Sequence, residues 1–336
     1  MKELIKKLTE VSSPSGREDK IRESIITEIK NHVDGYRVDA LGNLIAWKKG
    51  VSGKKLLFDA HMDEIGVVVT HVDDNGFLRV EMIGGVSPYV LLGTRIKFET
   101  GTVGVVGVEG ETGKEYAENM KNLAFDVIYV DIGATNKEDA MKKAPIGTFG
   151  TYEATFLDHG KRLVSKAMDD RIACAILVQV AKELKEPKDD VYFVFSVQEE
   201  VGLVGASVAA YDIKPDMAIA LDVTAGPDTP KAFKRMGFKL GAGPTIKIKD
   251  KASISSSQVV KKLTEIATTN GIPYQYEILI FGGTNARGYQ LTGAGIASGT
   301  VSVPTRYVHT PHEMVDYDDV LNTVALLKKL AEEGVA

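Results

Sequence analysis

Two adjacent glutamates, Glu199 and Glu200, follow the apolar run VYFVFSV at residues 191–197. Apart from one serine the run is aromatic and β-branched, which predicts a strand buried on both faces of a parallel sheet. The glutamates then stand at the carboxyl end of that strand. Ligands bind at this edge in open α/β sheets, so the pair is a candidate for acid–base or metal chemistry.

Other residues that could bind metal or move protons occupy similar places in the chain: His61, Asp63, Asp169, Asp222 and His309. The first two follow the run LLF, Asp222 follows MAIAL, Asp169 precedes a predicted helix, and His309 follows the last predicted strand. Each alone is explained by a helix cap or a hydrogen-bonded loop. Their recurrence at successive strand ends favours one shared site.

Carboxylates that share a site raise one another's pKa unless a cation lies among them. These motifs contain no run of lysine or arginine. Two imidazoles and three carboxylates, one of them shared, would give two divalent ions three protein ligands each and leave room for water. Paired ions about 3.5–4 Å apart polarise the substrate and activate water. The pattern predicts two divalent ions per subunit, and zinc, cobalt and manganese suit such ligands to differing degrees.

Neighbouring side chains at the end of a strand point to different sides. One of Glu199 and Glu200 could therefore bind metal, while the other takes a proton from water and delivers it to a leaving amine. His61 and Asp63 are two residues apart and point the same way. Asp63 could then orient and polarise His61 from behind.

The chain has 336 residues, enough for two domains. Apolar spacing predicts amphipathic helices around residues 4–8 and 21–29, the second preceded by a capping-box pattern from Ser15 to Glu18. From residue 66 to 162 the alternation, the glycines and a turn at 74–76 predict a small inserted all-β domain. Residues 1–65 and 163–336 should form one discontinuous α/β domain, a mixed sheet flanked by helices.

A net charge of −5 argues against a nucleic-acid partner. No apolar run approaches the roughly 20 residues that cross a bilayer, and the first residues lack the apolar core of a signal peptide. We therefore expect a cytoplasmic protein that is not bound to a membrane. The lysine-rich stretch KIKDKASISSSQ, residues 247–258, is interpreted as a solvated connection.

Taken in order, AHMDEIG, KAMDDRIAC, VQEEVGLVGA, LDVT and RYVHTPHE resemble the family-42 metallopeptidases, which include the tetrahedral (TET) aminopeptidases and their glutamyl and deblocking relatives. The resemblance spans essentially the whole chain. It implies roles for seven residues: His61 and Asp222 hold one metal ion, Glu200 and His309 hold the other, Asp169 bridges them, Glu199 is the general base and Asp63 supports His61.

The resemblance also implies removal of amino-terminal residues from short peptides, with metal-activated water as the nucleophile. Self-association through the inserted β domain, often into a tetrahedral dodecamer, is a further implication. One departure is Asn285 in FGGTNARG, where relatives commonly carry aspartate. We expect this change to affect the substrate pocket.

Three other functions are compatible with parts of this pattern. An endoglucanase needs two carboxyl groups facing one another across about 5–9.5 Å, and neighbours in one strand diverge. A metal-dependent N-acyl-amino-acid hydrolase or carboxypeptidase-like hydrolase would use similar ligands, and the sequence argues only weakly against it. A non-catalytic assembly or regulatory protein would be favoured by a missing ligand or base, but all seven positions are filled.

Overall fold

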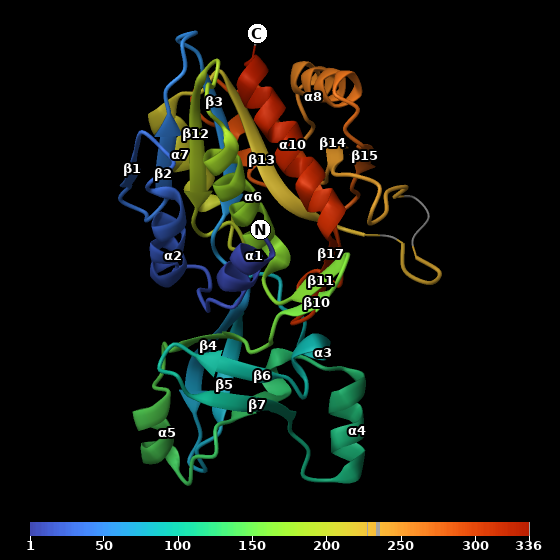
Figure 1. The fold of residues 1–336 in the computed structure, drawn as a ribbon. Coiled ribbons are helices and arrows are strands. Elements are labelled where there is room, and N and C mark those ends of the chain that lie inside the picture. Colours follow the sequence, from blue (N-terminus) through green and yellow to red (C-terminus); the bar gives the residue numbers. More distant parts are fainter. Residues whose placement is uncertain (227, 233–235, 336) are drawn as a thin grey trace.

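The computed structural model describes residues 1–226, 228–232 and 236–335. A large mixed sheet with helices on both faces lies above a smaller closed β-barrel (Figure 1). The predicted fold class, a mixed α/β sheet with a separate small β domain, is confirmed. None of the helices described combines the length and apolar character needed to cross a bilayer.

The strands of the large sheet are β1 (Gly35–Val38), β2 (Leu44–Lys48), β3 (Lys55–His61), β10 (Leu157–His159), β11 (Arg162–Ser165), β12 (Asp190–Ser196), β13 (Met217–Ala225), β14 (Thr245–Lys249), β15 (Gln275–Ile278), β16 (Ser298–Arg306) and β17 (Glu313–Asp316). The helices that accompany it are α1 (Lys2–Thr9), α2 (Asp19–Ile29), α6 (Met168–Glu183), α7 (Val204–Ile213), α8 (Ser257–Thr269), α9 (Ala286–Gln290) and α10 (Tyr317–Glu333).

Four neighbouring strands at the centre of the sheet, β12, β3, β13 and β16, run parallel. Ser196 of β12 pairs with His61 of β3. Ala220 of β13 pairs with Asp59 of β3, and two residues further along these strands stand Asp222 and His61. The carboxyl ends of these strands therefore meet at one edge of the sheet. This is the arrangement that brings polar residues from distant parts of the chain together.

The central strands are buried on both faces because helices cover each side. In β3, Leu56, Phe58 and Ala60 face a core shared with α1, α2, α6 and α10. Leu57 faces the opposite core, which α7 and α9 cover. A strand in this position gains from apolar side chains at every residue, which explains the unbroken apolar runs in the sequence.

The barrel closes in the order β4, β5, β8, β7, β6, β9 around its own core. Its strands are β4 (Gly66–Val72), β5 (Leu78–Ile83), β6 (Arg95–Phe98), β7 (Val103–Val108), β8 (Ile128–Asp131) and β9 (Phe149–Tyr152). Its connections contain α3 (Pro88–Leu91), α4 (Gly113–Lys121), a 3₁₀ turn (Phe125–Val127) and α5 (Lys137–Lys143), which the alternating pattern did not indicate.

The last strand of the barrel ends at Tyr152. Strand β10 pairs with β11 in the large sheet, although β10 precedes residue 162, where the sequence placed the end of the inserted domain.

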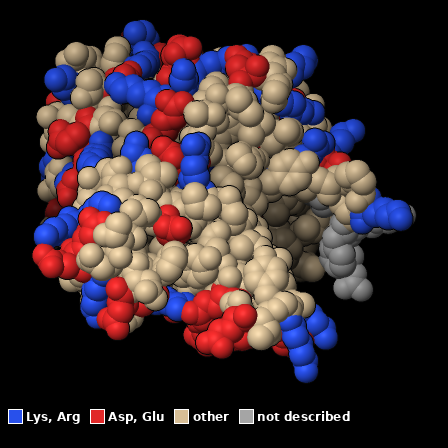
Figure 2. Space-filling model, turned by 90° about the horizontal axis from the view of Figure 1, so that it is seen from below, with Lys and Arg blue, Asp and Glu red and all other residues tan. Residues whose placement is uncertain are grey.

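Viewed from the barrel end, positive and negative side chains are intermixed, with uncharged areas between them (Figure 2). This face therefore carries no large field of one sign.

Arg171, in the first part of α6, is fully buried and joins three segments of the chain. Its guanidinium donates hydrogen bonds to the backbone carbonyls of Leu8, Val11, Ser13 and Met62. Beside it, Lys166 Nζ lies 2.7 Å from a carboxylate oxygen of buried Glu64. These contacts fix the segment that follows β3 against α6 and the end of α1.

Arg171→Met should lower the free energy of unfolding by about 3 kcal/mol, because buried carbonyl oxygens lose their donors. Arg37→Met, which removes an exposed ion pair with Asp212, should change it by less than about 1 kcal/mol. Urea denaturation of the metal-free proteins measures both. Equal losses in the two variants would contradict the structural role given to Arg171.

Candidate metal centre

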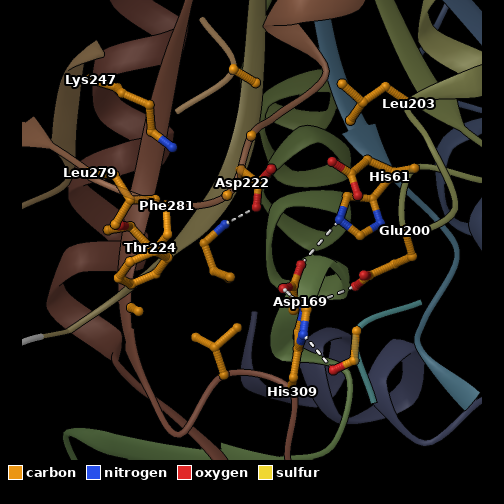
Figure 3. Close-up of a pocket in the computed structure, with 18 of the residues that line it drawn as sticks. His61, Asp169, Glu200, Leu203, Asp222, Thr224, Lys247, Leu279, Phe281 and His309 are labelled. Atoms are coloured by element: carbon orange, nitrogen blue, oxygen red, sulfur yellow. Dashed lines mark hydrogen bonds and ion pairs between the residues drawn. The ribbon is translucent and has the colours of Figure 1, made fainter. Parts of the chain in front are cut away.

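A cavity of about 580 Å³ opens at the carboxyl edge of the central strands (Figure 3). Six of the seven predicted site residues line it: His61, Asp169, Glu199, Glu200, Asp222 and His309. The seventh, Asp63, is fully buried behind His61. The structure therefore brings together residues that lie as far apart in the sequence as 61 and 309.

Asp169 lies between the two imidazoles (Figure 3). Its Oδ1 is 3.1 Å from Nε2 of His61, and its Oδ2 is 3.3 Å from Nε2 of His309. The same nitrogen of His309 is 3.4 Å from Oε1 of Glu200. Each imidazole thus faces a different oxygen of one carboxylate. Asp169 stands in the first turn of α6, where the backbone of Asp169 and Asp170 departs from helical geometry.

Among the residues that the structure describes, potential ligand atoms gather in three overlapping groups, each with its atoms within 4.8 Å of one another. The groups are His61, Glu199 and Asp222; His61, Asp169 and Glu200; and Asp169, Asp170 and Asp222. Such a density of carboxylate oxygens and imidazole nitrogens suits divalent cations.

Asp63 connects His61 to the glutamate pair. Its Oδ1 is 3.4 Å from Nδ1 of His61, so the opposite ring nitrogen points into the cavity. The carboxylate also accepts hydrogen bonds from the Ser15 hydroxyl (2.7 Å) and from the backbone N–H groups of Glu199 (3.0 Å) and Glu200 (3.1 Å). One buried carboxylate therefore positions both an imidazole and the turn that carries two acidic side chains.

The explanation of the glutamate pair by strand alternation is wrong. Strand β12 ends at Ser196, and both glutamates lie in the turn that follows. Gln198 adopts a left-handed backbone conformation, with φ of 55°. The directions of Glu199 and Glu200 are set by this turn and by the hydrogen bonds of their N–H groups to Asp63.

The metal-free cluster carries excess negative charge. Burial raises the pKa of Glu199 well above its ordinary value, and burial with repulsion from Asp169 raises the pKa of Asp222 to about 8. Burial acts to lower the pKa of His309, but its contacts with Asp169 and Glu200 outweigh burial and raise the pKa to about 12. Protons on imidazoles thus supply the positive charge that the carboxylates require. Divalent cations fit this site on the same grounds.

Sequence reasoning missed two buried carboxylates at the site. Glu313, on β17, accepts hydrogen bonds from the backbone N–H groups of Asp169 (2.9 Å) and His309 (2.7 Å). Asp170 accepts a long hydrogen bond from the N–H of His61 (3.3 Å), and its Oδ1 has no partner. Both residues belong to the motifs already noted, as the second aspartate of KAMDDRIAC and the last glutamate of RYVHTPHE.

The predicted capping box before the second helix is also wrong. Helix α2 begins at Asp19, and the Ser15 hydroxyl donates to Asp63 instead of capping the helix. Glu18 accepts hydrogen bonds from the N–H groups of Gly16 (2.8 Å) and Gln198 (3.1 Å). The segment before α2 therefore supports the turn that carries Glu199 and Glu200.

Two expectations about the substrate pocket change. Asn285 does not line the cavity; its amide is buried and donates to Asp59 (2.6 Å) and Ser196 (2.9 Å) beneath it. The stretch interpreted as a solvated connection begins inside β14, where Lys247 is 1% exposed and lines the cavity. The structure thus moves Asn285 out of the pocket and brings Lys247 into it.

The family model for M42 glutamyl aminopeptidases matches residues 42–326. This chain belongs to the M42 peptidase family. It is 50% identical over 327 residues to a protein of Acetivibrio thermocellus, a match that covers 97% of each chain. The M42 resemblance inferred from the motifs is confirmed, and with it the class of enzyme, a metal-dependent aminopeptidase.

Solved structures show the same M42 fold. An aminopeptidase of the archaeon Desulfurococcus kamchatkensis is 38% identical with a TM-score of 0.94, covering 99% of this chain and 94% of that one. The TET1 peptidase of Pyrococcus horikoshii, which can assemble into a tetrahedron or a large octahedral shell, is 35% identical with a TM-score of 0.88 and covers 99% of each chain.

If His61 and His309 bind metal as predicted, metal uptake should release protons. Contacts with carboxylates outweigh burial and raise the pKa of both imidazoles, so both are protonated at pH 7 in the metal-free protein. Only the neutral ring binds a cation, so each imidazole must lose its proton and apparent affinity should rise with pH. Calorimetric titration with zinc in buffers of different ionisation enthalpy measures the release.

The test variant is His309→Asn, which should release about one proton fewer on metal binding. The control is His32→Asn, which alters an exposed histidine and should leave the proton release unchanged. Equal heats in all buffers for the unaltered protein would show that neither imidazole gives up a proton to the metal.

Proposed function

We propose that this M42 enzyme uses two divalent ions to remove amino-terminal residues from short peptides. The observation that carries the proposal is the position of Asp169, whose two oxygens face the Nε2 atoms of His61 and His309 at 3.1 and 3.3 Å. This arrangement suits a carboxylate that bridges two cations. His61 and Asp222 would hold one ion, and Glu200 and His309 the other.

The ligand set favours zinc or cobalt, because imidazole nitrogens are mixed with carboxylate oxygens. When bound, such ions polarise the scissile carbonyl group and lower the pKa of water. The chain supplies the remaining requirements: a proton acceptor, a fixed orientation for each ligand and a recess that shields the reacting groups.

Glu199 is proposed as the general base. It lines the cavity, and its backbone is fixed by the hydrogen bond from its N–H to Asp63. Burial raises its pKa in the metal-free chain, and nearby cations would bring the pKa back toward neutrality. A carboxylate tuned in this way can accept a proton from the attacking water and deliver it to the leaving amine.

Asp63 is proposed as the residue that supports His61. Its Oδ1 faces Nδ1 of the ring, which keeps Nε2 directed toward Asp169 and the cavity. Because the same carboxylate accepts the N–H groups of Glu199 and Glu200, it fixes the base relative to the ligands. Contact with His61 and Ser15 outweighs burial and lowers the pKa of Asp63, so it stays ionised.

We also propose that the chain forms a homo-oligomer through the barrel. The barrel surface exposes large apolar side chains, among them Met82, Tyr89 and Val105, beside intermixed charges (Figure 2). Burial of these side chains against another subunit would add to the free energy of association. The TET1 peptidase, which shares the fold over 99% of both chains, supports a closed assembly such as a tetrahedral dodecamer.

The proposed activity is tested with aminoacyl chromogenic amides and their N-acetylated forms. Protein stripped of metal should hydrolyse neither, and protein restored with zinc or cobalt should hydrolyse only the unblocked amides. Release of acetate from N-acetylated amino acids, with no release of the chromophore from unblocked amides, would favour an N-acyl-amino-acid hydrolase. No chromophore release from either set and no acetate release from N-acetylated amino acids, with metal content verified, would favour a non-catalytic role.

Glu199→Gln and Glu200→Gln form a matched pair of variants at adjacent positions. Glu199→Gln should keep both ions and lower kcat by about 10²- to 10⁴-fold, because it loses proton transfer. Glu200→Gln should lower the metal content, because it loses a ligand. Metal analysis and rates on the same samples separate the two effects. A Glu199→Gln enzyme with full activity would remove the base from its role.

A further inference from the structure

The cavity extends beyond the metal centre to a second wall, formed by β13, β14 and the segment after β15. The residues that form this wall are Val223, Thr224, Lys247, Ala252, Leu279 and Phe281. In the close-up, Lys247, Leu279, Phe281 and Thr224 lie on the side of the cavity opposite His61 and Glu200, with Asp169 and Asp222 between the two sides (Figure 3). We call this set the far wall.

The charges at the far wall pair with one another. Lys247 Nζ is 3.0 Å from Glu277 and 3.9 Å from Asp250. Glu277 also accepts hydrogen bonds from the hydroxyls of Thr224 (2.9 Å) and Thr245 (2.6 Å). All three charged side chains are at most 1% exposed. A group entering the cavity therefore meets a cation already engaged by a carboxylate.

The accessible part of the far wall is apolar. Leu279 packs with Met236 and Phe238 in a small cluster of its own. Phe281 is 46% exposed although it lines the cavity, so an aromatic ring stands partly in solvent. An apolar group placed in this part of the cavity would bury that ring and gain free energy in proportion to the area covered.

We propose that the far wall receives the side chain of the substrate's amino-terminal residue, and that it selects apolar side chains of the size of leucine, methionine or phenylalanine. The inference rests on the proposed aminopeptidase function, which places the scissile bond at the metal centre. The side chain on the adjacent α-carbon is then the part of the substrate that can reach the far wall.

Charged side chains are disfavoured there for different reasons. Glu277 and Asp250 do not line the cavity, so an acidic side chain would approach Lys247, whose charge these two buried carboxylates already balance. A basic side chain would approach Lys247 and lose its hydration. Both must be desolvated without a free partner, which is costly. Small side chains lose contact instead, and each methylene missing from an apolar pocket costs about ten-fold or more in specificity.

The test is a comparison of kcat/KM for unblocked leucyl, methionyl, phenylalanyl, alanyl, glutamyl and lysyl amides with one leaving group, using the zinc- or cobalt-loaded protein. The three larger apolar substrates should exceed the alanyl, glutamyl and lysyl ones by about ten-fold or more. A glutamyl or lysyl substrate ranked first overturns the inference but leaves the aminopeptidase intact. No hydrolysis of any unblocked amide overturns the proposed function itself.

Phe281→Ala and Ile280→Ala locate the preference. Both residues are 46% exposed and adjacent, but of these two only Phe281 lines the cavity. Phe281→Ala should lower the leucyl-to-alanyl ratio of kcat/KM by about ten-fold, mainly through KM, and Ile280→Ala should leave it unchanged. An unchanged ratio in Phe281→Ala, or an equal fall in both variants, overturns the assignment.

Glu277→Gln tests the role of the paired charge. It leaves Lys247 with only the more distant Asp250, so the glutamyl-to-leucyl ratio should rise by about ten-fold relative to the unaltered enzyme. Circular dichroism and metal content confirm that the variant is folded and loaded. In a folded variant, an unchanged ratio overturns the claim that pairing with Glu277 is what excludes acidic side chains.

Discussion

A cluster of buried carboxylates at one edge of a parallel sheet is the constraint on which the rest of the structure depends. Asp169, Glu200 and Asp222 line one cavity, and each loses hydration there. The adjacent strand ends bring them together, and helix α6 adds Asp169. Apolar neighbours do not stabilise ionised carboxylates, so the surrounding chain supplies hydrogen-bond donors, and protonated imidazoles or bound cations balance the charge.

Two further carboxylates hold the backbone of the residues that form the cluster. Asp63 accepts the N–H groups of Glu199 and Glu200, and Glu313 accepts those of Asp169 and His309. Asp63 lies on a different segment from both of its donors, and Glu313 joins Asp169 of helix α6 to His309, four residues before Glu313. These hydrogen bonds hold the segments that carry the ligands. Those accepted by Asp63 are charge-assisted and stronger than neutral ones, because contacts with His61 and Ser15 outweigh burial and lower the pKa of Asp63. Loops with left-handed residues can thereby hold their side chains at fixed positions.

The sequence predicted what depends on local pattern. Unbroken apolar runs indicated the parallel strands, and the polar residues after them marked the edge where the cavity lies. It could not predict contacts that arise only on folding. Ser15 and Asp63 are 48 residues apart, and the hydroxyl that resembled a helix cap serves the active site instead. Lys247 looked solvated because its partner Glu277 comes from another strand, β15. The direction of the glutamate pair depends on one left-handed residue, Gln198.

The charged groups at the two ends of the cavity differ. Those at the metal centre are mainly carboxylates, whereas those at the far wall form an ion pair. At the metal centre the carboxylates outnumber the cationic side chains, so divalent cations fit there. At the far wall Lys247 is bound by Glu277 at 3.0 Å. Lys247 acts to lower the pKa of Asp222, but burial and repulsion from Asp169 outweigh it and raise that pKa, so Lys247 does not take the place of a metal ion. The cavity therefore still suits cations at one end and offers an apolar surface for recognition at the other.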